Sequence, residues 1–176
     1  MARSALIAGA SGIVGNSLAR HLIQQGWNVA GLARRPPQDI AGLTPVAADL
    51  LDPDGIQVAL REARPSHVFI TTWLRQPTEA ENIRVNAAMV RNLLDAVRLN
   101  GSVEHIALAT GIKHYLGPFA SHGKGNLPAT PFREGQPRLD IENFYYAQED
   151  DLRRSRARRA IQFCCSGQGV SGGGGT

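Results

Sequence analysis

Three glycines spaced three residues apart, Gly9, Gly12 and Gly15, lie between an apolar run and an amphipathic stretch. Residues 5–8 have the composition of a short buried strand, and residues 13–25 carry apolar side chains at helical spacing. In such a unit the first glycine permits a tight turn, the second lets backbone N–H groups approach a phosphate, and the third lets the helix pack on the sheet. The pattern predicts a nucleotide pyrophosphate at the helix N-terminus, with a tight turn that binds no nucleotide as the alternative.

The first 110 residues alternate between short apolar runs and helical patterns. Strands are expected at residues 5–8, 28–33, 44–48, 67–71 and 103–109, and helices at residues 13–25, 55–63 and 79–99. Within the first helix, the residues at helical spacing are Val14, Leu18, His21 and Leu22, and Gly26 ends the helix. Strands and helices that alternate at this spacing imply parallel strands joined by right-handed crossovers. The predicted fold is α/β, a Rossmann-type doubly wound parallel sheet that binds ligands at the carboxyl ends of its strands.

The periodicity fails between residues 111 and 142, where glycine and proline punctuate the chain. A loop of this length in a compact domain usually closes over a site or is disordered, and 111–142 is expected to be an active-site loop. A charged helix is expected from residue 143 to about 159, followed by a sixth strand at 161–165. Residues 1–165 therefore predict one NAD(P)-binding domain, and residues 166–176 a disordered glycine-rich tail.

Charge and composition narrow the class of partner. The net charge is +4, but five arginines between residues 153 and 159 account for it, next to Asp150 and Asp151. A nucleic-acid interface needs basic residues spread over a face with aromatic partners, so we expect no nucleic-acid binding. No stretch approaches the roughly 20 apolar residues of a membrane span, so we expect a cytoplasmic protein with no membrane partner. Adjacent Cys164 and Cys165 point to opposite faces of a strand and predict neither a disulfide nor a metal site.

The end of the second expected strand carries Arg34 and Arg35. NAD enzymes commonly have an acidic residue at this position, which would repel a 2′-phosphate. Two guanidinium groups can instead neutralise that phosphate and donate hydrogen bonds to it. The sequence therefore favours NADPH over NADH, with solvated surface arginines as the alternative.

The Tyr-x-x-x-Lys pair that is usual in short-chain dehydrogenases is absent, because the residue four positions after Tyr145 is Glu149. The chain has two lysines, Lys113 and Lys124. Lys113 directly follows the fifth expected strand, at the sheet edge where the nicotinamide end of a cofactor would lie. Its position makes Lys113 a candidate for the reaction site.

The chain resembles the progesterone 5β-reductase and iridoid synthase-like enone reductases, which are atypical extended short-chain dehydrogenases/reductases. The resemblance covers residues 4 to about 152 and depends on GASGIVGNSL at 9–18, ARR at 33–35, HVFITTW at 67–73, TGIKHYLGPF at 110–119, PRL at 137–139, and NFYY at 143–146 with Glu149 and Asp150. The lysine segment and the NFYY segment are more specific than the glycine loop.

This resemblance implies that Lys113 and Tyr145 are the catalytic residues. It implies hydride transfer from NADPH to the C=C bond of an enone or enal, with Tyr145 stabilising the developing enolate and Lys113 holding the cofactor ribose. His114 is expected to pack within the loop and not to act as a base. The implied cofactor contacts, together with the loop glycines Gly9 and Gly15, are Ser11, Gly12, Ile13, Arg34, Arg35, Asp49, Leu50 and Thr72.

Members of that family continue into a substrate-binding half, so the resemblance implies that this chain is truncated before it and that its enone reduction is impaired. Two other functions stay open. One is a residual NADP-binding module without turnover. The other is a sugar-nucleotide enzyme similar to NAD-dependent epimerases and dehydratases, which the missing Tyr-x-x-x-Lys pair disfavours. The expected partner is a small enone or enal, and the oligomeric state stays open, with a homodimer as one alternative.

Overall fold

The computed structural model describes residues 3–117, 131–133, 135–155 and 161–165. The strands within these ranges are β1 (Ser4–Ala8), β2 (Asn28–Ala33), β3 (Leu43–Ala47), β4 (His67–Ile70), β5 (His105–Thr110) and β6 (Ile161–Cys165). The helices are α1 (Ile13–Gln24), α2 (Pro53–Ala59), α3 (Glu79–Arg98), α4 (Lys113–Leu116) and α5 (Phe144–Arg154).

Neighbouring strands all pair in parallel, in the order β3-β2-β1-β4-β5-β6. The chain builds outward from β1 to β3 on one side and then returns to add β4, β5 and β6 on the other. The predicted α/β doubly wound parallel sheet is therefore confirmed. The order reverses between β1 and β4, which is where open sheets of this kind form a ligand crevice at their carboxyl edge.

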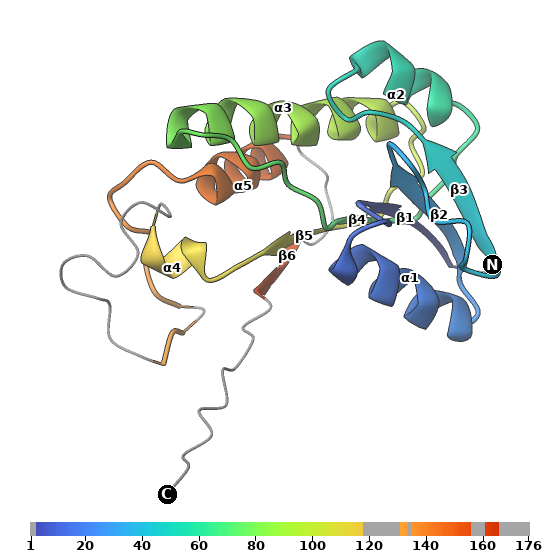
Figure 1. Cartoon of the computed structure of the whole chain (residues 1–176), viewed down its shortest axis with the longest axis horizontal. Coiled ribbons are helices and arrows are strands. Elements are labelled where there is room, and N and C mark those ends of the chain that lie inside the picture. Colours follow the sequence, from blue (N-terminus) through green and yellow to red (C-terminus); the bar gives the residue numbers. More distant parts are fainter. Residues whose placement is uncertain (1–2, 118–130, 134, 156–160, 166–176) are drawn as a thin grey trace, which may run out of the picture.

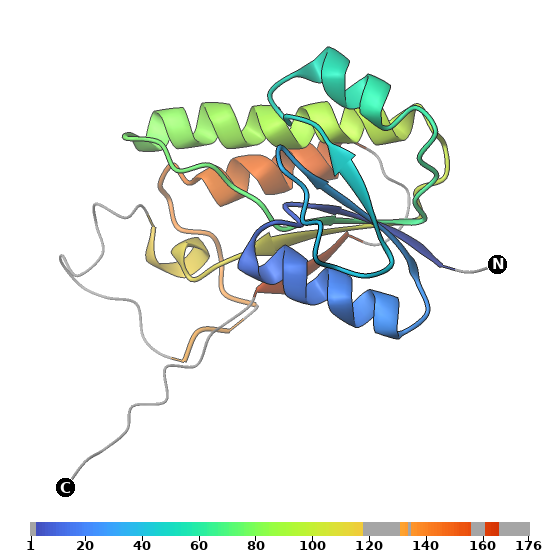
Figure 2. The same ribbon diagram turned by 45° about the vertical axis from the view of Figure 1, so that its right-hand side comes forward.

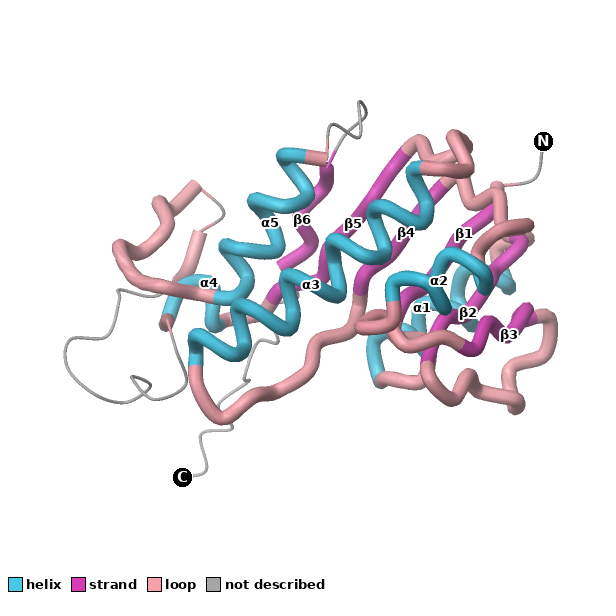
Figure 3. The backbone as a smooth tube through the Cα atoms, turned by 90° about the horizontal axis from the view of Figure 1, so that it is seen from above, coloured by secondary structure: helices cyan, strands magenta, loops and turns pink. Residues whose placement is uncertain are grey.

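Helices α2, α3 and α5 cover one face of the sheet and α1 covers the other (Figures 1 and 2). Strand β1 is buried on both faces. Leu6 and Ala8 join the core beneath α3, whereas Ala5 and Ile7 pack toward α1. Figure 3 shows α5 lying alongside α3, and Leu152 of α5 belongs to the same core. The layered packing fixes the carboxyl edge of the sheet as a rigid platform for the loops that follow its strands.

The buried face of α1 contains two of the four side chains found at helical spacing. Leu22 is buried and Leu18 packs against the same core, whereas Val14 is 49% exposed and His21 is exposed. Gly15 and Ala19 complete the buried face, and their small size allows the helix axis to approach the sheet closely. The helical period was therefore predicted correctly, and the two small residues were not singled out as buried.

Two further predictions are corrected in detail. Helix α2 begins at Pro53, earlier than expected, because Asp52 Oδ1 accepts a 3.0 Å hydrogen bond from the N–H of Gly55 and caps the first turn. A short helix, α4, lies inside the segment predicted as irregular loop. The expected helix end near residue 159 and the tail at 166–176 lie outside the described residues. No helix in the described ranges has both the length and the apolar composition needed to cross a membrane.

Candidate functional site

The loop between β1 and α1 contains two positions that only glycine fits. Gly9 has a φ of +95°, and a Cβ built on it would lie 2.7 Å from the Cβ of Thr72. A Cβ on Gly15 would lie 2.2 Å from the carbonyl oxygen of Gly9 and 2.7 Å from Thr71 Oγ1. Thr71 Oγ1 donates in turn to the carbonyl oxygen of Ala8 at 2.9 Å. The backbones of the loop, the helix and the end of β4 therefore touch with no room for side chains.

The N-terminus of α1 opens onto the surface beside this loop. Gly12 is the N-cap residue, and no side chain caps the helix. Ser11 is exposed, and Ile13 is 90% exposed. Free N–H groups and the positive end of the helix dipole favour an anion here, so the loop could hold the phosphates of a nucleotide.

A cavity runs from the glycine loop across the carboxyl ends of β2, β3 and β4. Its lining includes Gly9, Asp49, Leu50 and Thr72, which sequence analysis had assigned to the cofactor. A second hollow is lined by Ser11, Arg34 and Arg35, and it adjoins the first through the shared Ser11 and Arg34. Residues that follow β1, β2, β3 and β4 thus line two adjoining hollows.

The guanidinium groups of Arg34 and Arg35 are exposed at the rim of these hollows. Within the described part of the chain, neither guanidinium forms a hydrogen bond or ion pair. The carboxylate of Asp39, which follows shortly after, pairs with Arg20 instead, at 2.6 Å. Two uncommitted positive charges next to a cavity fit a ligand with a terminal phosphate.

Lys113 starts the α4 turn directly after β5, and its side chain is only 3% exposed. Its Nζ lies 2.5 Å from Glu79 Oε2 and 4.3 Å from the centre of the Phe144 ring. Glu79 is the first residue of α3, and its other oxygen, Oε1, accepts a 2.8 Å hydrogen bond from the N–H of Phe144. The buried ammonium is therefore paired with a carboxylate, as a buried charge must be.

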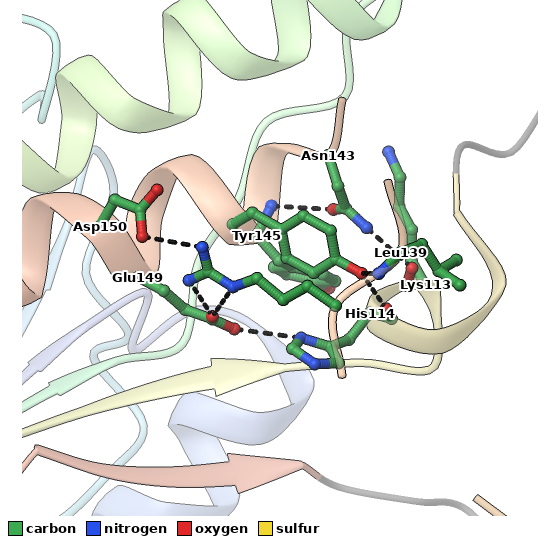
Figure 4. Close-up of polar contacts among 9 residues, drawn as sticks. Lys113, His114, Leu139, Asn143, Tyr145, Glu149 and Asp150 are labelled. Carbon is green, nitrogen blue, oxygen red and sulfur yellow. Dashed lines mark hydrogen bonds and ion pairs between the residues drawn. The ribbon is translucent and has the colours of Figure 1, made fainter. Parts of the chain in front are cut away.

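Tyr145, the second residue of α5, is half-buried, with its ring centre 4.2 Å from that of Phe144. Its hydroxyl lies beside the backbone that follows β5, because a Cβ built on Gly111 would be 3.3 Å from Tyr145 Oη. Gly111 precedes Lys113 by only two residues. The structure therefore brings Lys113 and Tyr145 to the same end of β5 (Figure 4).

Asn143 links the segments that carry these two residues. Its side chain caps α5, with Oδ1 accepting from the N–H of Tyr145 at 3.0 Å, and its Nδ2 donates to the carbonyl oxygen of Lys113 at 2.9 Å (Figure 4). The side chain is buried, so neither bond competes with water. One amide group therefore fixes the backbone of both candidate catalytic residues.

The side chain of Tyr146, by contrast, is held by contacts within the fold. Its ring is buried, and the guanidinium of Arg138 lies 4.9 Å from the ring centre. Its hydroxyl donates to the carbonyl oxygen of His114 at 2.6 Å and accepts from the N–H of Leu139 at 3.1 Å. The two adjacent tyrosines are thus distinguished by their surroundings, and Tyr145 is the one placed at the site.

Glu149 occupies the helical position where a Tyr-x-x-x-Lys pair would carry its lysine. The side chain is buried, with Oε1 3.1 Å from His114 Nδ1 and Oε2 2.5 Å from Arg138 Nη2. Burial raises the pKa of Glu149, but hydrogen bonds with His114 and Arg138 outweigh burial and hold that pKa below its usual range. Arg138 also reaches Asp150, at 2.8 Å. Glu149 therefore anchors the α4 turn to α5, and His114 has the packing role that was predicted for it.

Glu79 and Asn143 contact Lys113 and were not predicted from the sequence as part of the site. Each stands at the start of a helix, where an acidic residue or an asparagine is explained by the helix dipole and by capping alone. No local pattern indicates that either contacts Lys113, which lies 34 and 30 residues away along the chain. Among the described residues, no group of three or more His, Cys, Asp and Glu side chains could hold a metal ion.

The sequence matches known enzymes over most of its length. Residues 5–137 match the model of the NAD dependent epimerase/dehydratase family. The chain is 40% identical over 166 residues to (S)-8-oxocitronellyl enol synthase CYC2 of Camptotheca acuminata, covering 89% of this chain and 43% of that enzyme. It is 41% identical over 158 residues to 3-oxo-Delta(4,5)-steroid 5-beta-reductase of Arabidopsis thaliana, covering 84% of this chain and 40% of that enzyme. These relatives confirm the family resemblance, and the chain spans less than half of their length.

Solved structures support the fold. UDP-glucose 4-epimerase from Brucella ovis, in complex with NAD, superposes with a TM-score of 0.70 at 19% identity, over 92% of this chain and 50% of that one. The Bordetella bronchiseptica enzyme WbmH, in complex with NAD+, gives 0.67 at 20% identity, over 93% of this chain and 55% of that one. At this level of identity the similarity shows the shared sheet architecture and nothing about substrate.

Proposed function

Because this chain belongs to the NAD dependent epimerase/dehydratase family, we propose that it binds NADPH and reduces the C=C bond of a small enone or enal. The observation that carries this proposal is the placement of Lys113 and Tyr145 together at the carboxyl end of β5, although no Tyr-x-x-x-Lys pair exists. The named activities of the two curated relatives, a steroid 5-beta-reductase and an enol synthase, support the same class of chemistry.

The residues around the cavity fit a phosphorylated dinucleotide. Side chains at Gly9 and Gly15 would fill the space in which the loop contacts its neighbours, and the open N-terminus of α1 offers N–H groups to a pyrophosphate. Arg34 and Arg35 would contact a 2′-phosphate, while Asp49 and Leu50 would line the adenine pocket. When bound, NADPH supplies a hydride to the β-carbon of the substrate.

Tyr145 and Lys113 have complementary roles in this proposal. As the hydride adds, negative charge develops on the carbonyl oxygen of the substrate, and a hydrogen bond from Tyr145 Oη would stabilise it more in the transition state than in the ground state. The Lys113 ammonium places a positive charge at the same end of β5, and this charge would further stabilise the negative charge on the substrate oxygen. Tyr146 Oη is held within the fold by His114 and Leu139, whereas Tyr145 Oη lies at the end of β5, so Tyr145 is the proposed donor.

A module that binds NADPH without turnover is the second candidate function. It is favoured by the two hollows at the carboxyl edge of the sheet, which are lined by residues proposed to contact the cofactor. A sugar-nucleotide epimerase is disfavoured, because Glu149 replaces the lysine of the Tyr-x-x-x-Lys pair and is held by His114 and Arg138.

Calorimetric titration with NADPH and NADH, followed by an assay of NADPH oxidation, separates these functions. We expect NADPH to bind at least tenfold more tightly than NADH, a difference of about 1.4 kcal/mol. Small enones and enals should cause oxidation of NADPH, whereas the matching saturated ketones and aldehydes should not. Binding without oxidation would favour the module, and the absence of NADPH binding would contradict both functions.

A further inference from the structure

We propose that Glu79 is the positioning residue of the candidate site, in that its carboxylate holds the Lys113 ammonium in place and ties it to the start of α5. The inference rests on the proposed function, because it assigns Glu79 a role through Lys113. Nothing in the glycine loop or in the tyrosine segment indicates this role.

The two oxygens of this carboxylate take different partners. Oε2 lies 2.5 Å from Lys113 Nζ, and Oε1 accepts from the N–H of Phe144 at 2.8 Å. Asn82 Nδ2 adds a weaker contact to Oε2 at 3.4 Å. The residue therefore joins three segments, the starts of α3, α4 and α5, that are far apart in the sequence.

Burial prevents water from taking the place of either partner in the Lys113–Glu79 ion pair. The side chain of Lys113 is 3% exposed and that of Glu79 is 16% exposed, so water cannot replace the carboxylate without a movement of the chain. The face of the Phe144 ring, 4.3 Å from Nζ, stabilises a cation but does not neutralise it. An ammonium deprived of this carboxylate would move away from its present position, because a buried charge is costly once its counter-charge is removed. That movement would take the positive charge away from Tyr145.

Replacement by glutamine separates the two contacts. In Glu79→Gln the amide oxygen can still accept from the N–H of Phe144, whereas the amide nitrogen is a donor and would face the Lys113 ammonium. The variant therefore keeps the link to α5 and breaks the link to lysine. Glu81→Gln is the matched control, because Glu81 lies in the same first turn of α3 but bonds to Thr78 Oγ1.

Lysine side-chain nitrogen NMR tests the pairing directly and without cofactor. The chain has two lysines, so Lys124→Arg assigns the Lys113 signal. We expect a slowly exchanging Lys113 ammonium signal in the unmodified chain and in Glu81→Gln, and its loss or displacement in Glu79→Gln. An unchanged signal in a folded Glu79→Gln chain would overturn the proposal.

If the Glu79→Gln variant does not fold, a second measurement on the unmodified protein tests the pairing. Overhauser contacts between the Lys113 ammonium protons and the Glu79 side chain would support the pairing, and their absence would overturn it.

NADPH titration then tests whether the pairing serves the site. Glu79→Gln should weaken NADPH binding by at least about fivefold, whereas Glu81→Gln should leave it unchanged. In a Lys113→Met background Glu79→Gln should cause no further loss, because Glu79 acts through the lysine. An equal loss in both backgrounds would overturn the proposal. If the unmodified chain fails to bind NADPH, the proposed function fails, and the NMR result still decides the pairing.

Discussion

Tyr146 Oη donates a 2.6 Å hydrogen bond to the carbonyl oxygen of His114, so the second tyrosine of the NFYY segment fastens α5 to the α4 turn. The preceding residue, Tyr145, directs its hydroxyl to the backbone at Gly111 instead. A helix rotates successive side chains by about 100°. The fixed orientation of Tyr146 therefore determines where Tyr145 points.

Substitution of the two tyrosines should separate stability from turnover. Tyr146→Phe leaves the N–H of Leu139 without its acceptor and the carbonyl oxygen of His114 without its donor, so we expect a loss of about 1–3 kcal/mol in the free energy of unfolding. Tyr145→Phe should act on the reaction and lower enone reduction by about a hundredfold or more. Urea unfolding and NADPH oxidation measure the two effects. A silent Tyr145→Phe beside an inactive, stable Tyr146→Phe would show that the roles are exchanged.

Removal of the two arginines at the rim of the cavity should abolish the preference for NADPH over NADH. Arg34→Ala with Arg35→Ala should weaken NADPH binding to the level of NADH, about tenfold or more, because NADH lacks the 2′-phosphate that the arginines would contact. NADH affinity should stay nearly constant. Arg61→Ala, at an exposed arginine after α2, removes one positive charge outside the cavity lining and is the control. Equal affinities of the unmodified chain for both cofactors would contradict the assignment.

The course of the chain through β1–β5 was predictable, because burial on a sheet or against a helix imposes a period of two or of about 3.6 residues on the sequence. The glycine loop was predictable for a related reason. Its constraint is local, since Gly9 and Gly15 contact each other within one turn. In α1 the same period identified Leu18 and Leu22, which pack against the core, whereas tertiary packing also buried Ala19 and left Val14 exposed.

The interior of the site was less predictable, because its contacts join distant residues. Lys113 was identified by its place after a strand, but its partner Glu79 lies in another helix, 34 residues earlier. Glu149 was identified as the residue in place of a lysine and as part of the family resemblance, but its contacts with His114 and Arg138 depend on how a loop folds back over α5. Such contacts follow from tertiary packing, which leaves no periodic signal in the sequence.

Stability should fall in acid through Glu149. The folded-state pKa of this carboxyl lies below its ordinary value of 4.5, so the group contributes stability that is complete above that value and is lost as the pH falls through 4.5 toward the folded-state pKa. Urea unfolding from about pH 7 to about pH 3 should therefore show a steep decline. Glu149→Gln should be less stable at neutral pH and show a shallower decline, because it has no proton to take up. Glu142→Gln, at an exposed position before α5, should keep the original slope, and an equal slope in all three proteins would contradict this account.

Gly15→Ala should move the N-terminus of α1 away from the proposed phosphate site. The added methyl group would lie 2.2 Å from the carbonyl oxygen of Gly9, so α1 must shift away from the loop or the loop must open. Overpacking of this kind costs about 1–3 kcal/mol, and the displaced helix would carry its N–H groups away from a bound pyrophosphate. We expect a lower Tm and a loss of NADPH affinity of more than about tenfold. Gly135→Ala is the control, because no described atom lies within 4 Å of a Cβ at that position. Tight NADPH binding by Gly15→Ala would show that the nucleotide lies elsewhere, since no side chain fits at Gly15 while the loop, α1 and the end of β4 keep their present contacts.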